Sequence, residues 1–327
     1  MTGSISGRCG AILVALAVTV PLAATMTSST AATPATTGQR SSVCDTRGPI
    51  AASALVDGVS GCSLVGRVVV SGSAAVVVPR AGYGVGADGV AGAGSSDAAS
   101  LQVTNLDGVV RATVDGDAAP ASRGLAARAA GACSAGQFKL ASGRHPWGKV
   151  LSWRYHRPSE PKRYATGKAL AHIRAGMTNM RTARNDCNRT SNLSARARYA
   201  GVSATGPGIR VKGSRITCGK LNSRNVVGWG ALPNSLLGWT CYWWGGSGKM
   251  IAADMRLSTS AKVVTAIPGS CTQRYDLQSL ATHEWGHAWG LGHVSNPNLT
   301  MHHFLPACST AFRTLGLGDI KGMRQLY

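Results

Sequence analysis

Three histidines and one glutamate lie within an eleven-residue stretch, HEWGHAWGLGH, that runs from His283 to His293. On a helix, His283 and His287 face the same way, so both can bind one zinc ion at about 2.0–2.1 Å. Glu284 would lie beside that ion, where it could accept a proton from a bound water. His293 can reach the ion only if the helix ends and the chain turns back at about Gly290. The pattern therefore predicts a zinc site with a general base.

A buried helix that carries histidines by chance is the plain alternative for any lone HExxH motif. Here five positions are fixed, namely His, Glu, His, Gly and His, which makes a chance match much rarer. The chain has only two glutamates, Glu160 and Glu284, and one of them falls where the base is needed. We therefore favour the zinc site.

The motif is similar to the signature of the metzincin metallopeptidases, and the residues beyond it resemble the matrixins, the matrix-metalloproteinase-like members, in a bacterial-type secreted form. Met301 follows His293 by eight residues, which is the spacing of the matrixin methionine turn. The closing run LGLGDIKGMRQLY resembles the last matrixin helix, although Gly318 replaces the first aspartate of the usual pair. The specific resemblance covers roughly residues 271–327, and a weaker one in element order extends back to about residue 148.

The resemblance implies one catalytic Zn²⁺ and a set of site residues: the metal ligands His283, His287 and His293, the base Glu284, and Met301 beneath the metal. In matrixins the residue four before the first histidine helps to close the main specificity pocket. Here it is Ser279, which implies a deep pocket for large apolar side chains. Matrixins have Tyr-Pro directly after the methionine, as a wall of the pocket, where this chain has His302 and His303. Astacin-like metzincins have at the second of these positions a tyrosine that can approach the zinc, so His303 could do the same or form a pocket wall of altered polarity.

Several family features are absent from the sequence. The cysteine-switch segment PRCGxPD is missing, because GRCG at residues 7–10 falls within the apparent signal. No histidine and aspartate cluster for a second zinc is found; His145, His156 and His172 show no ligand spacing and are treated as structural. Residues 135–327 hold six acidic residues, which argues against calcium sites because calcium needs several carboxylate oxygens.

The first residues and the cysteines indicate export. Arg8 and the apolar run at 11–24 predict a signal peptide over residues 1–28, too short to span a membrane, followed by a disordered lead over 29–43. Outside the expected signal the chain has eight cysteines, which predict up to four disulfides in an oxidising compartment. Cys44 and Cys62 are natural partners by proximity. We expect Cys133 to pair within the catalytic half rather than bind zinc.

The predicted fold class is α+β: a matrixin-like catalytic domain, with a twisted mixed sheet of about five strands and three helices, preceded by a small β-rich region. We divide the chain into residues 44–114, a β-rich region that could be a propeptide, a linker at 115–134, and the catalytic domain at 135–327. Any inhibition by residues 44–132 is expected to act by covering the cleft.

Within the catalytic domain, alternating apolar residues predict a strand at 149–157 and another at about 193–199. A helix is expected after Pro161, an irregular region up to Val226, and a hairpin at about 236–258. Asp276 is expected to cap the zinc helix.

The formal charge is +21, and residues 135–327 carry 26 Lys and Arg against 6 Asp and Glu. Such a field favours non-specific attraction to anionic surfaces, and no nucleic-acid motif accompanies it. We predict a secreted, monomeric zinc endopeptidase whose protein or peptide substrates bind along one arm of the 236–258 hairpin. The alternatives are a basic cell-surface or anionic-polymer binding protein with a structural zinc site, and a metzincin specialised for a cell-wall peptide.

Overall fold

The computed structural model describes residues 42–92, 100–115, 128–141 and 143–327. The expected signal at 1–28, nearly all of the lead at 29–43, and residues 116–127 of the expected linker lie outside this part. The fold is α+β, as predicted. Within the described ranges, no helix has the length and apolar character needed to cross a membrane.

Five strands of the catalytic half form the predicted mixed sheet, in the order β12, β13, β11, β7, β8. Their bounds are Leu236–Gly245, Lys249–Ser258, Val226–Gly230, Leu151–Tyr155 and Ala197–Val202. β12 and β13 form the expected hairpin and are antiparallel, whereas the other pairs are parallel. β12 is therefore the edge strand of these five. β8 begins at Ala197, later than the expected strand at 193–199.

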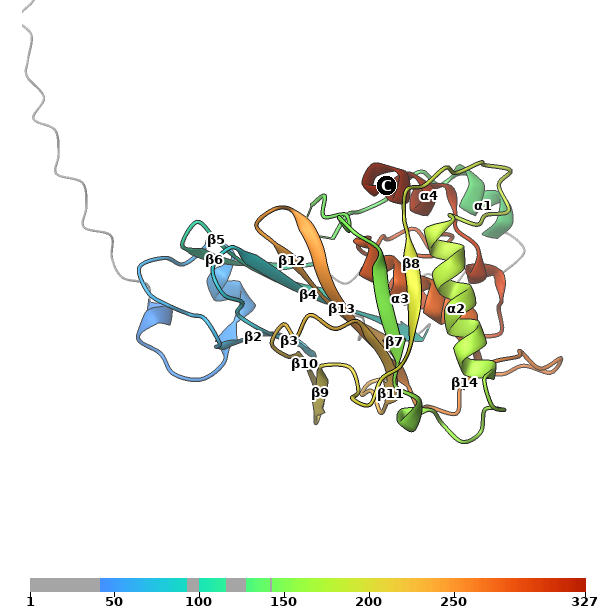
Figure 1. Ribbon diagram of the computed structural model, residues 1–327, viewed down its shortest axis with the longest axis horizontal. Coiled ribbons are helices and arrows are strands. Elements are labelled where there is room, and N and C mark those ends of the chain that lie inside the picture. Colours follow the sequence, from blue (N-terminus) through green and yellow to red (C-terminus); the bar gives the residue numbers. More distant parts are fainter. Residues whose placement is uncertain (1–41, 93–99, 116–127, 142) are drawn as a thin grey trace, which may run out of the picture. The chain divides into compact units, whose positions relative to one another are not determined.

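Two helices, α2 (Lys168–Arg181) and α3 (Leu277–Trp289), pack together on one face of this sheet (Figure 1). α2 turns Ile173, Met177 and Met180 inward, as its sequence period predicts. The Nε1–H of Trp285 on α3 donates to the carbonyl of Ile173 at 3.1 Å, so the two helices are fixed in register. The closing helix α4 spans Leu317–Leu326, and α1 spans Arg128–Ser134, at the end of the expected linker.

The N-terminal region is built into the sheets of the catalytic half. β4 (Tyr83–Gly92), β5 (Ser100–Leu106) and β6 (Val109–Val114) extend the large sheet, with β4 hydrogen-bonded to β12. A short strand, β16 (Phe304–Leu305), also pairs with β4. Asp107 and Gly108 form the tight turn between β5 and β6. The part of the large sheet beyond β12 is therefore formed by strands from residues 83–114.

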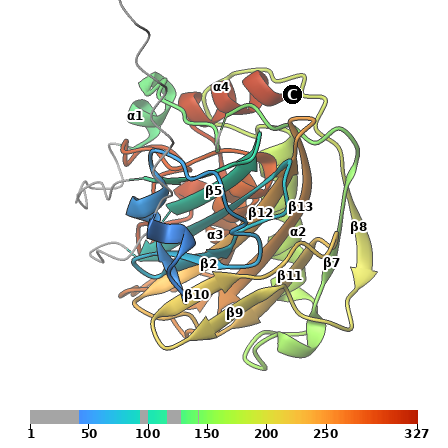
Figure 2. The ribbon, with the colours of Figure 1, turned by 90° about the vertical axis from the view of Figure 1, so that its left-hand side faces the viewer.

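A second sheet, in the order β1, β2, β3, β10, β9, also joins the two halves (Figure 2). Its strands span Ile50–Ala51, Val68–Ser71, Ala74–Val77, Arg215–Cys218 and Ile209–Lys212. The expectation that the chain is irregular up to Val226 is therefore wrong. β10 forms because it pairs with β3, a strand about 140 residues earlier, and such a partner is not visible in a local pattern. The remaining paired strands are β14 (Val263–Val264) and β15 (Tyr275–Asp276).

Four disulfides brace the described residues: Cys44–Cys62, Cys133–Cys187, Cys218–Cys241 and Cys271–Cys308. The predicted Cys44–Cys62 bond and the pairing of Cys133 within the catalytic half are both confirmed. Each bond lies within one half of the chain. No disulfide of the described residues therefore links the N-terminal strands to the catalytic half.

Candidate metal centre

The three motif histidines converge on one point. Their Nε2 atoms lie 3.0–3.2 Å from one another, and all three side chains are buried. Four ligands around an ion at 2.0–2.1 Å would be about 3.3 Å apart, so this spacing fits one face of a tetrahedral zinc site. It is the only cluster of three potential metal ligands within the described ranges.

Backbone carbonyls fix the orientation of two of the rings. His283 Nδ1 lies 2.7 Å from the carbonyl oxygen of Thr300, and His287 Nδ1 lies 2.9 Å from that of Leu291. Because a carbonyl only accepts, each Nδ1 must carry the proton, which leaves the Nε2 lone pair free for a metal. A buried three-histidine group of this kind could therefore bind zinc.

The ends of α3 explain how the third histidine reaches the cluster. Asp276 caps the helix, as predicted, by accepting a hydrogen bond from the Ser279 backbone N–H at 2.8 Å. At the other end, Gly290 has φ of 101°, a left-handed conformation that favours glycine. The chain therefore reverses after α3 and returns His293 to the other two imidazoles.

Burial controls the electrostatics of the three rings. It lowers the pKa values of His283 and His293 well below their ordinary range, and the neighbouring imidazoles lower them further. Burial also lowers the pKa of His287, while the nearby Asp88 carboxylate acts in the opposite direction. All three rings therefore favour the neutral form that binds a metal.

The Glu284 carboxylate lies fully buried beside the three rings. Its Oε2 accepts a hydrogen bond from the Thr240 hydroxyl at 2.5 Å, and its Oε1 has no hydrogen-bond partner among the described residues. Burial raises the pKa of Glu284 well above its ordinary value, although the Thr240 hydrogen bond favours the charged form. This side chain therefore has the burial and the raised proton affinity of a general base.

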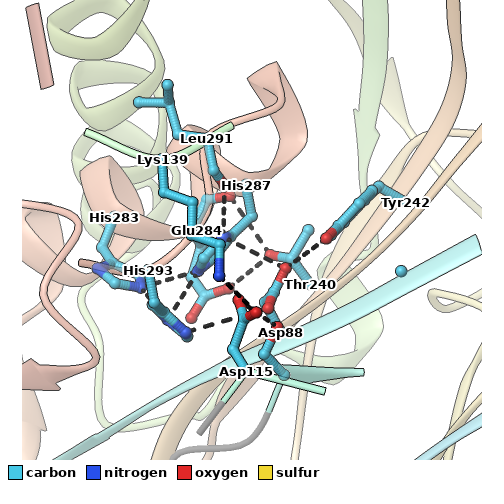
Figure 3. Close-up of polar contacts among 12 residues, drawn as sticks. Asp88, Asp115, Lys139, Thr240, Tyr242, His283, Glu284, His287, Leu291 and His293 are labelled. Carbon is cyan, nitrogen blue, oxygen red and sulfur yellow. Dashed lines mark hydrogen bonds and ion pairs between the residues drawn. The ribbon is translucent and has the colours of Figure 1, made fainter. Parts of the chain in front are cut away.

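A further carboxylate, Asp88 of β4, was not identified from the sequence. Its Oδ2 lies 3.6 Å from His287 Nδ1, and its Oδ1 lies 4.0 Å from His293 Nδ1 (Figure 3). The hydroxyl of Tyr242 donates to Oδ2 at 2.6 Å. The one local signal for this residue is a single acid within a glycine-rich run, GYGVGADGVAG, which otherwise resembles a loop.

The other predicted site residues lie around this centre in different ways. Met301 is buried beneath α3, so close to Gly286 that a Cβ there would lie 2.2 Å from its sulfur. The His303 ring lies 5.9 Å from the His293 ring, centroid to centroid, outside the cluster of three. Ser279 is buried, and its hydroxyl donates to Asp276 Oδ2 at 2.9 Å. Its role in a pocket therefore stays a prediction.

Comparison with known proteins agrees with the site. The family model for matrixin matches residues 179–327, a segment that holds the end of α2, the zinc motif and α4. No curated protein matches the chain. The matrixin resemblance inferred from the sequence is thereby confirmed over this segment, and it implies zinc metallopeptidase activity.

Proposed function

We propose that the protein is a secreted zinc endopeptidase in which Glu284 is the general base. The observation that carries this proposal is the buried Glu284 carboxylate beside three converging imidazole Nε2 atoms. A zinc site that served only as a structural brace would have no use for this glutamate. Four disulfides and the lack of a membrane-spanning helix within the described ranges fit an extracellular protein.

His283, His287 and His293 would hold the zinc ion. When bound, zinc polarises a scissile carbonyl and lowers the pKa of a water towards about 7. Glu284 would accept the proton of the attacking water and pass it to the leaving amine. The Thr240 hydroxyl holds the Glu284 carboxylate in place through its hydrogen bond to Oε2.

Substrates would bind along β12 by adding a strand to the catalytic sheet at the edge that β4 covers in this structure, once β4 has left that edge. Main-chain hydrogen bonds would supply affinity in this mode, and pockets for alternate side chains would supply selectivity. We propose that the pocket closed by Ser279 accepts large apolar side chains just after the cleaved bond.

The test replaces Glu284 with Gln. The variant should keep the fold and the bound zinc but lose about 10²- to 10⁴-fold in peptide hydrolysis, because only the base is removed. The measurement is the digestion of a random peptide mixture, with and without a chelator. It is made with the intact chain and with a nicked chain, which has been cut once within residues 116–127. Glu160→Gln, at the only other glutamate, is the matched control and should retain activity.

Two results would contradict the proposed function. One is cleavage by Glu284→Gln at the rate of the unmodified chain. The other is cleavage by the unmodified chain that continues after a chelator has removed its zinc.

A further inference from the structure

Lys139 lies beside the turn that carries the third motif histidine. The Gly292 N–H donates to the Lys139 carbonyl at 2.9 Å, and Leu140 forms an antiparallel bridge with Leu291. The stem of the Lys139 side chain crosses Gly292 closely, since a Cβ at that glycine would lie 3.3 Å from Lys139 Cγ. The catalytic half therefore holds Lys139 next to His293 through its own backbone.

The Lys139 ammonium forms an ion pair beside the metal centre. Figure 3 shows its side chain pointing to Asp115, and Lys139 Nζ lies 2.5 Å from Asp115 Oδ1. Asp115 Oδ2 accepts a hydrogen bond from the Ser100 hydroxyl at 3.4 Å, and Ser100 is in register with Asp88. Burial lowers the pKa of His287, and the charges of Asp88 and Asp115 oppose this effect. The ion pair therefore lies close enough to His287 to influence its charge.

The two members of this ion pair belong to different halves of the chain. Asp115 directly follows β6, which pairs with β5 and through it with β4. The proposed substrate binding requires β4 to leave β12, and no disulfide of the described residues would keep Asp115 behind. Lys139 stays with the turn that follows α3. Its ammonium, on a side chain that is already 47% exposed, would then face the vacated edge without its carboxylate.

The catalytic half offers few carboxylates that could replace Asp115. Residues 135–327 carry six acidic residues against 26 Lys and Arg. Each of the six accepts a hydrogen bond from another group of the catalytic half: Glu160, Asp186, Asp254, Asp276, Glu284 and Asp319. The best replacement for Asp115 is therefore a carboxylate of the substrate, and the excess of positive charge favours the approach of an acidic peptide.

We propose that Lys139 selects peptide substrates with an Asp or Glu side chain within two residues of the cleaved bond. This inference rests on the proposed peptidase function and adds a substrate class to it. The substrate carboxylate would take the place of Asp115 at the Lys139 ammonium. That place is near the metal centre, because Asp115 adjoins Asp88 through Ser100, and Asp88 Oδ2 lies 3.6 Å from His287 Nδ1. A strand rises about 3.3 Å per residue, so a carboxylate that reaches this place belongs to a residue close to the cleaved bond.

The first experiment identifies the cleaved sequences. The nicked chain digests the random peptide mixture, and the residues within two positions of each cleaved bond are counted relative to their share of the mixture. Glu should exceed Gln there by about threefold, a ratio in the range of an exposed ion pair. Lys139→Glu should instead favour Lys and Arg at these positions, which the loss of a merely structural contact would not do. Lys162→Glu, at an exposed lysine before α2, makes the same change of charge and should keep the preference for Glu. An equal preference for Glu in both variants, or none in the unmodified chain, would overturn the inference.

The second experiment measures binding without cleavage, so that its result does not depend on activity. The random peptide mixture is passed over the immobilised, zinc-loaded nicked chain that carries Glu284→Gln, and the retained peptides are sequenced. They should be about threefold richer in Glu than those retained when Lys139→Glu is added, whereas adding Lys162→Glu should change little. Equal retention of Glu peptides with either added variant would overturn the inference.

The two experiments also separate this inference from the proposed function. Cleavage without a preference for acidic residues would overturn the inference and leave the peptidase function standing. A nicked chain that cleaves no peptide would refute the peptidase function, whereas the retained peptides would still decide whether Lys139 selects acidic side chains.

Discussion

The position of the Glu284 carboxylate, which we propose as the general base, depends on the absence of a side chain on the neighbouring strand. Gly238 of β12 lies so close to Glu284 that a Cβ at this position would be 2.2 Å from Oε1. The Thr240 hydroxyl, two residues further along the same strand, holds Oε2. β12 therefore both leaves room for the carboxylate and determines its direction.

Replacing Gly238 with Ala should push the Glu284 carboxylate away from the metal centre. We expect a loss of about 100-fold in peptide hydrolysis by the nicked chain, because a displacement of about 1 Å at a reacting group can cost this much. Zinc content should not change, since the three histidines are untouched. Gly269→Ala is the control, because a Cβ there meets nothing within 4 Å. Equal activity of the two variants would argue against a fixed position for the base.

The residues predicted from the sequence are those whose partners are close in the chain. His283, Glu284, His287 and His293 lie within one helix and its turn, so their spacing alone indicates a shared ion. Asp88 lies on a strand about 200 residues earlier in the chain. No local sequence pattern predicts that it lies close to these residues in space. The carboxylate beside the imidazoles could therefore not be found by sequence reasoning.

At the level of elements, the closing helix supports the segment at Thr300 and Met301, which in turn supports His283. Asp319 of α4 accepts backbone N–H bonds from Gly316, Thr300 and Met301 at 2.8, 2.8 and 3.1 Å. The Thr300 carbonyl then accepts the Nδ1–H of His283. A single buried carboxylate thus connects α4 to the ring of His283.

Asp319→Ala should destabilise the fold and weaken metal binding together. Three buried N–H groups lose their acceptor, so we expect a loss of about 3 kcal/mol or more in the free energy of unfolding. Zinc affinity should fall about 10- to 100-fold through the loosened His283 ring. Urea unfolding and competition with a chelator measure the two effects. The exposed Asp186→Ala is the control, and a variant Asp319→Ala with the control's unfolding midpoint would contradict this account.

Elements with strong local patterns were predicted well, whereas those made by distant pairing were not. The β12–β13 hairpin and α3 follow from apolar runs, a turn and a capping aspartate in the sequence. β4 is glycine-rich and β10 is short. Each forms a strand because it pairs with a strand from the other half of the chain. Strand formation depends on such partners more than on the intrinsic preference of the residues, so the local sequence could not predict these strands.

At the scale of the whole molecule, several cations line one hollow on the face of the large sheet that is turned away from α2 and α3. The hollow has a volume of about 1220 Å³, and no acidic residue is among those that line it. On β7, Arg154 alternates with the buried Trp153 and Tyr155 and so points away from α2 and α3. Five exposed cations line the hollow: Arg80, Lys149, Arg154, Arg198 and Arg224. This basic hollow is therefore a candidate site for the expected attraction to anionic surfaces.

We expect the basic hollow to bind a linear polyanion, with polyphosphate as the probe. Changing Arg154, Arg198 and Arg224 to Gln should weaken binding about tenfold, since each exposed charge contact contributes up to about 1 kcal/mol. The control replaces Lys162, Arg184 and Arg189 with Gln, because these three residues are exposed and do not line the hollow. Titrations at two salt concentrations should show that the unmodified protein binds more weakly at the higher one. Equal weakening by both triple variants would mean that net charge, rather than this hollow, attracts the polymer.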